Sequence, residues 1–386
     1  MSSTTIAVLD GHNDLPWQMR KLSYDWSRCD ISLPQPQLHT DLARIRSGGL
    51  RAQFWSVYVP CSFTGDAAVT ATLEQIDGVY QMIESYPDDF VLVTSADGVE
   101  ECLAKGPGGP VASLLGAEGG HSINNSLGTL RDLHRLGVRY MTLTHNDNND
   151  WADSATDEPR HHGLSDFGRE VVREMNRIGM LVDLSHVSPD TMRDALATSE
   201  APVIFSHSST KAVCDHPRNV PDDVLADMAA KGGTCMITFV PSFVKQEVAD
   251  WRREVEAAVD TSGIDKADFE ARDKWAKDNC PAAPVATLDD VVAHVEHARE
   301  VAGIDHIGLG GDYDGVGTTP DGLADVAAYP NLVDALRGKG WSEEDLAKLG
   351  HRNIIRTLRD AEAVAVRLRE ERTASLASLT PAASTE

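Results

Sequence analysis

Histidine or carboxylate side chains follow six of the short apolar segments of this chain. Imidazole and carboxylate groups bind divalent transition metals, and both also act as general acids and bases. A recurrence of these types after successive apolar segments therefore predicts one metal-centred site built from distant parts of the chain. The residues concerned are His12 with Asp14, Glu118, His145, His186, His207 and Asp312.

The first pair illustrates the two ways in which such residues can be interpreted. His12 and Asp14 come after the run Ile6-Ala7-Val8-Leu9 and are two residues apart, so in extended backbone both side chains point the same way. The alternative is a helix N-cap aspartate beside an incidental histidine, and the pair alone does not decide between them. The repetition of the pattern later in the chain favours the metal site.

The elements that must position these residues alternate between apolar runs and helical patterns. Strand–helix alternation predicts parallel strands, and eight such units favour a (β/α)8 TIM barrel, an α/β fold whose strand ends all open on one face. An open doubly wound sheet is the alternative, but no GxGxxG follows the first strand. The predicted strands are Thr5–Leu9, Gln53–Val59, Val111–Gly116, Arg139–Thr144, Met180–Leu184, Val203–Ser206, Thr234–Phe239 and His306–Gly310, with Phe90–Val93 as a short peripheral one.

Two regions interrupt the alternation. Residues 244–284, rich in Trp, Glu, Asp, Lys and Ala, predict a helical insertion between the seventh and eighth barrel strands. Residues 374–386 are rich in Ser, Thr and Ala and are expected to be a disordered tail. We therefore predict a single catalytic domain over residues 1–373.

Composition limits the partners and the location. The 386 residues contain 35 Lys and Arg and 60 Asp and Glu, a formal charge of −25, which disfavours nucleic acid and anionic lipid as partners. We expect no membrane span, because no apolar run approaches ~20 residues, and no signal peptide, because the first residues lack a basic segment. The six cysteines form no CxxC pair, which is typical of reduced thiols in a cytoplasmic protein.

The ligand types narrow the choice of metal. Imidazole and carboxylate without thiolate suit zinc, with iron, manganese and cobalt left open. More ligands are present than one tetrahedral ion needs, so two ions are expected. Glu118 is the natural carboxylate bridge, because its strand lies between the others. No lysine stands in a comparable position, which argues against a carbamylated lysine.

Seven motifs occur in order between about residues 6 and 360 of the chain. They are Asp10-Gly11-His12-Asn13-Asp14-Leu15-Pro16, Gly116-Ala117-Glu118-Gly119-Gly120-His121-Ser122, Leu143-Thr144-His145-Asn146, Asp183-Leu184-Ser185-His186-Val187-Ser188, Ser206-His207-Ser208-Ser209, Arg218-Asn219-Val220-Pro221-Asp222 and Gly310-Gly311-Asp312-Tyr313-Asp314-Gly315-Val316. Together they resemble the renal (membrane) dipeptidase family of zinc metallopeptidases, within the amidohydrolase superfamily. Tyr313 stands where phenylalanine is familiar in that family, and the 244–284 insertion is longer than in the animal enzymes, which leaves substrate preference open.

The resemblance implies a residue assignment and an activity. It places one zinc on His12 and Asp14 and a second on His186 and His207, with Glu118 bridging. It also implies a homodimer that hydrolyses dipeptides, L-Xaa-D-Xaa among them, by a hydroxide held between the two ions. The competing functions are another amidohydrolase-type reaction on a lactone or phosphoester, and a non-catalytic metal-binding protein. The residues implied for substrate binding are His145, Arg218 and Asp312, of which His145 and Asp312 are also catalytic.

Overall fold

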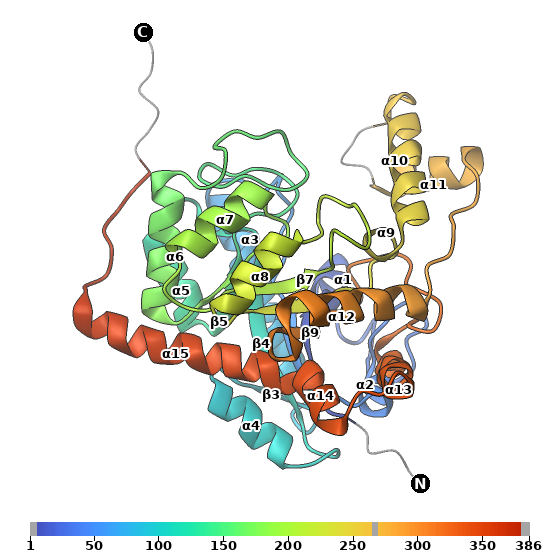
Figure 1. Ribbon diagram of the computed structural model, residues 1–386, viewed down its shortest axis with the longest axis horizontal. Coiled ribbons are helices and arrows are strands. Elements are labelled where there is room, and N and C mark those ends of the chain that lie inside the picture. The colour runs from blue at the N-terminus through green and yellow to red at the C-terminus, as the bar shows by residue number, and fades with distance from the viewer. Residues whose placement is uncertain (1–5, 265–268, 380–386) are drawn as a thin grey trace.

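Nine parallel strands form the sheet of this protein, for which the computed structural model describes residues 6–264 and 269–379 (Figure 1). Its order is β2-β1-β9-β8-β7-β6-β5-β4-β3, and β2 also pairs with β4, so eight strands close into a barrel and β3 lies outside it. The predicted TIM barrel and the short peripheral strand are confirmed. The strands are β1 (Val8–Asn13), β2 (Leu50–Ser56), β3 (Phe90–Leu92), β4 (Val111–Glu118), β5 (Val138–Thr142), β6 (Leu181–Asp183), β7 (Ile204–Ser208), β8 (Thr234–Ile237) and β9 (Ile307–Leu309).

Helices surround the barrel, and several of them begin where the sequence supplies a capping group. Ser188, for example, accepts the backbone N–H of Thr191, and Pro189 occupies the first turn of the same helix. The helices are α1 (Leu15–Lys21), α2 (Leu42–Gly48), α3 (Asp66–Ser85), α4 (Ala96–Ala104), α5 (Leu127–Arg135), α6 (Asp166–Ile178), α7 (Pro189–Thr198), α8 (Asp222–Ala230), α9 (Pro241–Val244), α10 (Gln246–Asp260), α11 (Phe269–Asn279), α12 (Leu288–Ala302), α13 (Tyr329–Gly338), α14 (Glu343–Ala347) and α15 (Asn353–Glu371).

The first strand is displaced from its predicted position. The apolar run suggested Thr5–Leu9, whereas β1 continues through the polar residues to Asn13 and pairs with β2 there; Thr5 lies outside the described residues. β4 likewise ends at Glu118, two residues beyond its predicted end. Polar residues at the carboxyl ends of barrel strands stay in the sheet because they face the site and not a solvent loop.

The barrel interior is closed at the amino ends of the strands by α15. Inward residues such as Leu9, Phe54 and Leu114 form one buried cluster with Ile354 and Leu358 of that helix. α15 also contacts α6 and α4, and the red helix of Figure 1 lies between them. Because side chains fill the barrel at the amino ends of its strands, the carboxyl ends are left to form a functional site.

The predicted insertion between the seventh and eighth barrel strands is helical. α10 and α11 project from the barrel (Figure 1) and share a small cluster of their own that includes Val255, Val259 and Ala276. No helix among residues 6–264 and 269–379 is both long and apolar enough to cross a membrane. All six cysteines carry free thiols.

The tail predicted from residue 374 is only partly described. Residues 374–379 have no helix or strand, although Ser375 hydrogen-bonds to Glu170 and Glu174 of α6. Residues 380–386 lie outside the described residues. The division into a domain and a disordered tail stays a prediction.

A buried histidine makes the stability of this fold depend on pH. The Nδ1 atom of His294 lies 3.1 Å from the backbone nitrogen of Thr210, and its Nε2 atom lies 3.1 Å from the Val244 carbonyl oxygen. The neutral ring therefore ties α12 to α9, and burial lowers the pKa of His294 to about 4. In the unfolded chain the same histidine binds a proton near pH 6.5. Acidification from pH 6.5 toward 4 therefore favours the unfolded chain and lowers the free energy of unfolding by up to ~3 kcal/mol.

We therefore expect the thermal midpoint of the metal-loaded protein to fall between pH 7 and pH 5, and to fall less in His294→Gln. Glutamine offers an acceptor and a donor but does not titrate. Comparing the two proteins at each pH by scanning calorimetry cancels any effect of metal release. Equal pH dependence in both would show that His294 does not contribute to it.

Candidate metal centre

Six side chains from the carboxyl ends of five barrel strands meet above the barrel interior. The strands are β1, β4, β6, β7 and β9, and each side chain follows or ends its strand, as the sequence predicted. Three overlapping groups have ligand atoms within 4.8 Å of one another, and His145 beyond β5 belongs to one of them. These groups are His12 with Glu118 and His207, Glu118 with His145 and His186, and His12 with Asp14 and Asp312.

Glu118 lies at the centre of this cluster. One carboxylate oxygen, Oε1, is 3.1 Å from Nε2 of His186 and 3.5 Å from Nε2 of His207. The other oxygen, Oε2, is 3.4 Å from Nε2 of His12 and accepts a hydrogen bond from Ser56. Burial raises the pKa of Glu118, but the surrounding imidazoles outweigh it and hold the pKa well below its usual range. An ionised carboxylate thus presents one oxygen to each half of the cluster.

His186 and His207 point at the same spot. Their Nε2 atoms lie 3.0 Å apart, and burial lowers the pKa of both rings well below the ordinary value. Two neutral imidazoles with converging nitrogens are a ligand arrangement for a transition metal. His186 has a φ of +69°, a strained conformation for a residue other than glycine, which turns its ring toward this spot.

His12 and Asp14 also come together, although not by the route that the sequence suggested. Nε2 of His12 lies 3.3 Å from an Asp14 oxygen, but Asp14 has left the strand and stands at the N-cap of α1 with φ −98° and ψ 21°. Its side chain makes no capping hydrogen bond, so the carboxylate is free for the site. The prediction of the pair is consistent with the geometry, while the extended-backbone reason for it was wrong.

Hydrogen bonds on the far side of two rings fix which nitrogen is available. Tyr140 donates its hydroxyl proton to the Gly11 carbonyl and can accept from Nδ1 of His12, 2.8 Å away. Ser206 donates to Asp183 in the same way and lies 2.9 Å from Nδ1 of His207. When the rings are neutral, Nδ1 therefore carries the proton in both of them, which leaves the Nε2 lone pairs facing Glu118.

The residues present fit a metal ion. Nε2 of His12 and one oxygen of Asp14 are buried without a hydrogen-bond partner among the described residues. Burial lowers the pKa of His12, but Tyr140, Glu118 and Asp14 outweigh it and raise the pKa well above its usual range, so these groups favour a positive charge at Nε2, whether a proton or a bound metal ion. Unpartnered acceptors around a negative centre are what a cation would satisfy. Sequence reasoning missed Tyr140, Ser206 and Asp183, because only the closed barrel brings them to the ligands.

His145 lies at the edge of the cluster. Its Nε2 atom is 3.8 Å from Glu118, its ring packs against that of His186, and Nδ1 is 3.6 Å from the thiol of Cys61. Burial lowers the pKa of His145 to about 4, so the ring is neutral. The contact with Cys61 had no signal in the sequence.

Asp312 and Arg218 are close enough to influence each other's charge. Burial raises the pKa of Asp312 well above its usual value, and Asp14 and Glu118 add to this while Arg218 opposes it. Burial lowers the pKa of Arg218 only to about 10, so its guanidinium keeps its charge over the Phe243 ring. The backbone of Gly315 packs closely against Asp312, because a Cβ atom at position 315 would lie 2.5 Å from an Asp312 oxygen.

The remaining polar residues of the motifs have other roles. His121 has its Nε2 atom 3.0 Å from the Val59 carbonyl oxygen. Asp314 accepts the backbone N–H of His39 and so supports a loop. Asp150 accepts a hydrogen bond from Asn125.

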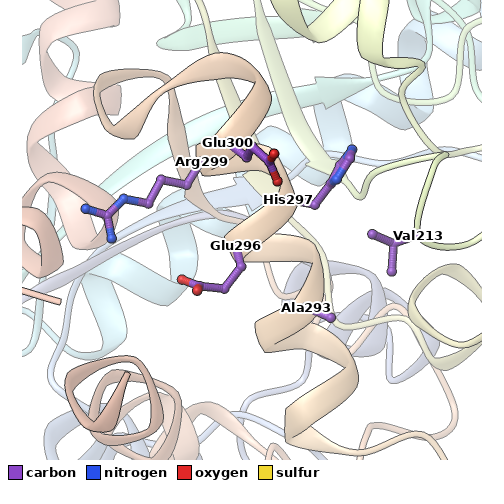
Figure 2. Close-up of a pocket in the computed structure, with 6 residues that line it drawn as sticks. All are labelled: Val213, Ala293, Glu296, His297, Arg299 and Glu300. Atoms are coloured by element: carbon purple, nitrogen blue, oxygen red, sulfur yellow. The ribbon is translucent and has the colours of Figure 1, made fainter. Parts of the chain in front are cut away.

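A separate hollow of about 610 Å³ lies on α12 (Figure 2). Two of its side chains are already paired, His297 with Asp222 and Arg299 with Asp345, each at 2.9 Å. It contains none of the clustered histidines, so we assign it no part in the chemistry. Its lining residues are Val213, Ala293, Glu296, His297, Arg299 and Glu300.

A parallel barrel with histidines and carboxylates at its carboxyl end defines the class of amidohydrolase-like metal-dependent hydrolases. Within that class, the chain belongs to the membrane dipeptidase family, peptidase family M19, whose model matches residues 3–372. The protein is a metal-dependent dipeptidase. The resemblance inferred from the seven motifs is thereby confirmed.

Relatives agree with this assignment. An uncharacterized dipeptidase of Schizosaccharomyces pombe is 41% identical over 373 residues, which span 93% of this chain and 82% of that protein. The crystal structure of dipeptidase AC, of family M19, is 25% identical with a TM-score of 0.77, and covers 93% of this chain and 99% of its own. A metallopeptidase of Rhodobacter sphaeroides, bound to a phosphinate mimic of L-Ala-D-Ala, is 26% identical with a TM-score of 0.76, and covers 93% of this chain and 100% of its own.

Proposed function

We propose that this dipeptidase uses two zinc ions and accepts L-Xaa-D-Xaa dipeptides. The observation that carries the proposal is the position of Glu118, whose two oxygens face different histidines at 3.1 Å and 3.4 Å. One ion would be held by His12 and Asp14 and the other by His186 and His207, with Glu118 shared. Support for a D-residue comes from the related metallopeptidase that binds a mimic of L-Ala-D-Ala.

When bound, the zinc ions would activate a water molecule and polarise the scissile carbonyl. The protein side chains would carry out the other tasks. His145 is neutral and can donate a hydrogen bond to the carbonyl oxygen as it gains charge, which is worth ~3 kcal/mol for a well-placed donor. Asp312, near His12 and Asp14, would accept the proton of the water and return it to the leaving amine.

Arg218 would determine the length of the substrate. Its guanidinium is buried and charged, and Nε has no hydrogen-bond partner among the described residues. A planar fork of donors suits a carboxylate. In a dipeptide the free C-terminal carboxylate is one residue away from the scissile peptide bond, so a clamp beside the metal ligands would select dipeptides. The homodimer stays a prediction that is based on the family resemblance. The cytoplasmic location stays a prediction that is based on the cysteine content.

A screen of dipeptides tests the proposed function. We expect L,L and L,D dipeptides to be hydrolysed and D,L dipeptides to be poor substrates, with two zinc ions per chain measured on the same preparation. Lactones and phosphoesters serve as the control substrates. Turnover of these controls with inert dipeptides, or full activity with one metal ion per chain, would contradict the proposal.

Arg218→Ala is expected to lower kcat/KM about 100-fold for dipeptides with a free C-terminal carboxylate, since a buried charged partner of the substrate is lost. C-terminally amidated dipeptides should lose much less, and the metal content should not change. Arg218→Lys, which keeps the charge but not the fork, is the matched control and should fall between the two. Equal losses on free and amidated substrates would exclude a carboxylate clamp.

A further inference from the structure

The thiol of Cys61 lies beside the imidazole of His145. Cys61 follows β2, and its Sγ atom is 3.6 Å from Nδ1 of His145. The backbone N–H groups of Asn146 and Asp147 hydrogen-bond to the same sulfur. The sulfur thus already accepts two hydrogen bonds from the loop that carries His145, and its own S–H is the group left to meet the ring.

The orientation of that thiol bears on the tautomer of His145. A neutral imidazole carries its single proton on either Nδ1 or Nε2, and the hydrogen bond at one nitrogen decides the state of the other. A thiol that donates to Nδ1 requires an unprotonated Nδ1 and therefore an Nε2–H. On the opposite side of the ring Nε2 lies 3.8 Å from a Glu118 oxygen, and a carboxylate favours a proton on the facing nitrogen.

The thiol keeps the proton that this arrangement needs. Burial raises the pKa of Cys61 to about 11, so the group is protonated at neutral pH. The ring itself is held in place by two aromatic neighbours, Tyr58 with centroids 4.8 Å apart and His186 at 4.4 Å. The ring cannot easily turn away from the sulfur.

We propose that Cys61 is a positioning residue for the dipeptidase reaction: its S–H donates to Nδ1 of His145 and keeps the proton of that ring on Nε2, the nitrogen that faces Glu118. The inference deepens the proposed function, since it rests on His145 acting as a hydrogen-bond donor to the substrate carbonyl. Cys61 does not itself touch the substrate.

Two substitutions at one position separate the donor from the volume of the side chain. Cys61→Val fills the same space without a donor, and Cys61→Ser keeps a donor. We expect Cys61→Val to lower kcat about tenfold, the effect of one lost hydrogen bond, with KM and metal content unchanged. Cys61→Ser should stay within about threefold of the parent enzyme. Where the valine variant does not fold, Cys61→Ala replaces it.

Nitrogen NMR on zinc-loaded enzyme with ¹⁵N-labelled histidine provides the second measurement. The signals of His145, assigned by their loss in His145→Gln, should show an unprotonated Nδ1 in the parent and in Cys61→Ser, and a mixture of tautomers in Cys61→Val. A proton on Nδ1 in the parent, or unchanged kcat and signals in Cys61→Val, would overturn the inference. Because the NMR result needs no substrate, it decides the tautomer even if the dipeptide proposal fails.

Discussion

Replacing Glu118 by glutamine is expected to remove bound metal and to lower kcat at least ~10³-fold. Among the described residues, this carboxylate is the one group whose oxygens lie within 3.5 Å of the rings of His12, His186 and His207, so its charge acts on all three. An amide keeps the shape of the side chain but presents an NH₂ group where an anion is needed. Loss of several kcal/mol of transition-state stabilisation by the metal corresponds to a rate effect of this size.

Metal content by mass spectrometry and turnover of a dipeptide, both measured on the same preparation, test this prediction. Glu174→Gln is the matched control: Glu174 of α6 is also buried, but it pairs with Arg131 of α5 and Arg177 of α6, away from the cluster. This control should lose stability and keep its metal. Full metal content and activity in Glu118→Gln would remove Glu118 from the centre of the site.

Asp312→Asn is the substitution with the second largest expected effect, a loss of kcat of about 10²–10⁴-fold with metal content retained. Asparagine preserves the size of the side chain but cannot accept and return a proton, and general acid–base catalysis is worth about that factor. The site already disfavours the charge of Asp312 through burial and through Asp14 and Glu118. Bound cations act in the opposite direction and favour the carboxylate that the reaction needs.

Asp314→Asn, two residues away, is the control for Asp312→Asn. Burial raises the pKa of Asp314 to about 6, and its carboxylate accepts the backbone N–H of His39, so it supports a loop. We expect Asp314→Asn to change thermal stability while kcat stays close to that of the parent. Normal turnover in Asp312→Asn would show that another group moves the proton.

Local sequence was enough to predict most of the architecture. Strands of a barrel are short apolar runs and their helices carry capping signals, such as Ser188 with Pro189, that depend only on nearby residues. The ends of the strands were harder to predict from the sequence, because β1 continues through Asp10 and His12 only when β2 and β9 pair with it. Hydrogen bonding between strands distant in the chain sets those ends.

For this protein the sequence alone determined the types of the candidate metal-ligating residues and the face on which they would meet. Parallel strands point their carboxyl ends one way, so residues that follow them share a face whatever the details of packing. Only the tertiary structure decided the contacts behind the ligands: Tyr140 reaches His12 across 128 residues, and Cys61 reaches His145 across 84. Barrel closure sets these contacts, because it brings side chains of different strands together at distances that no local spacing encodes.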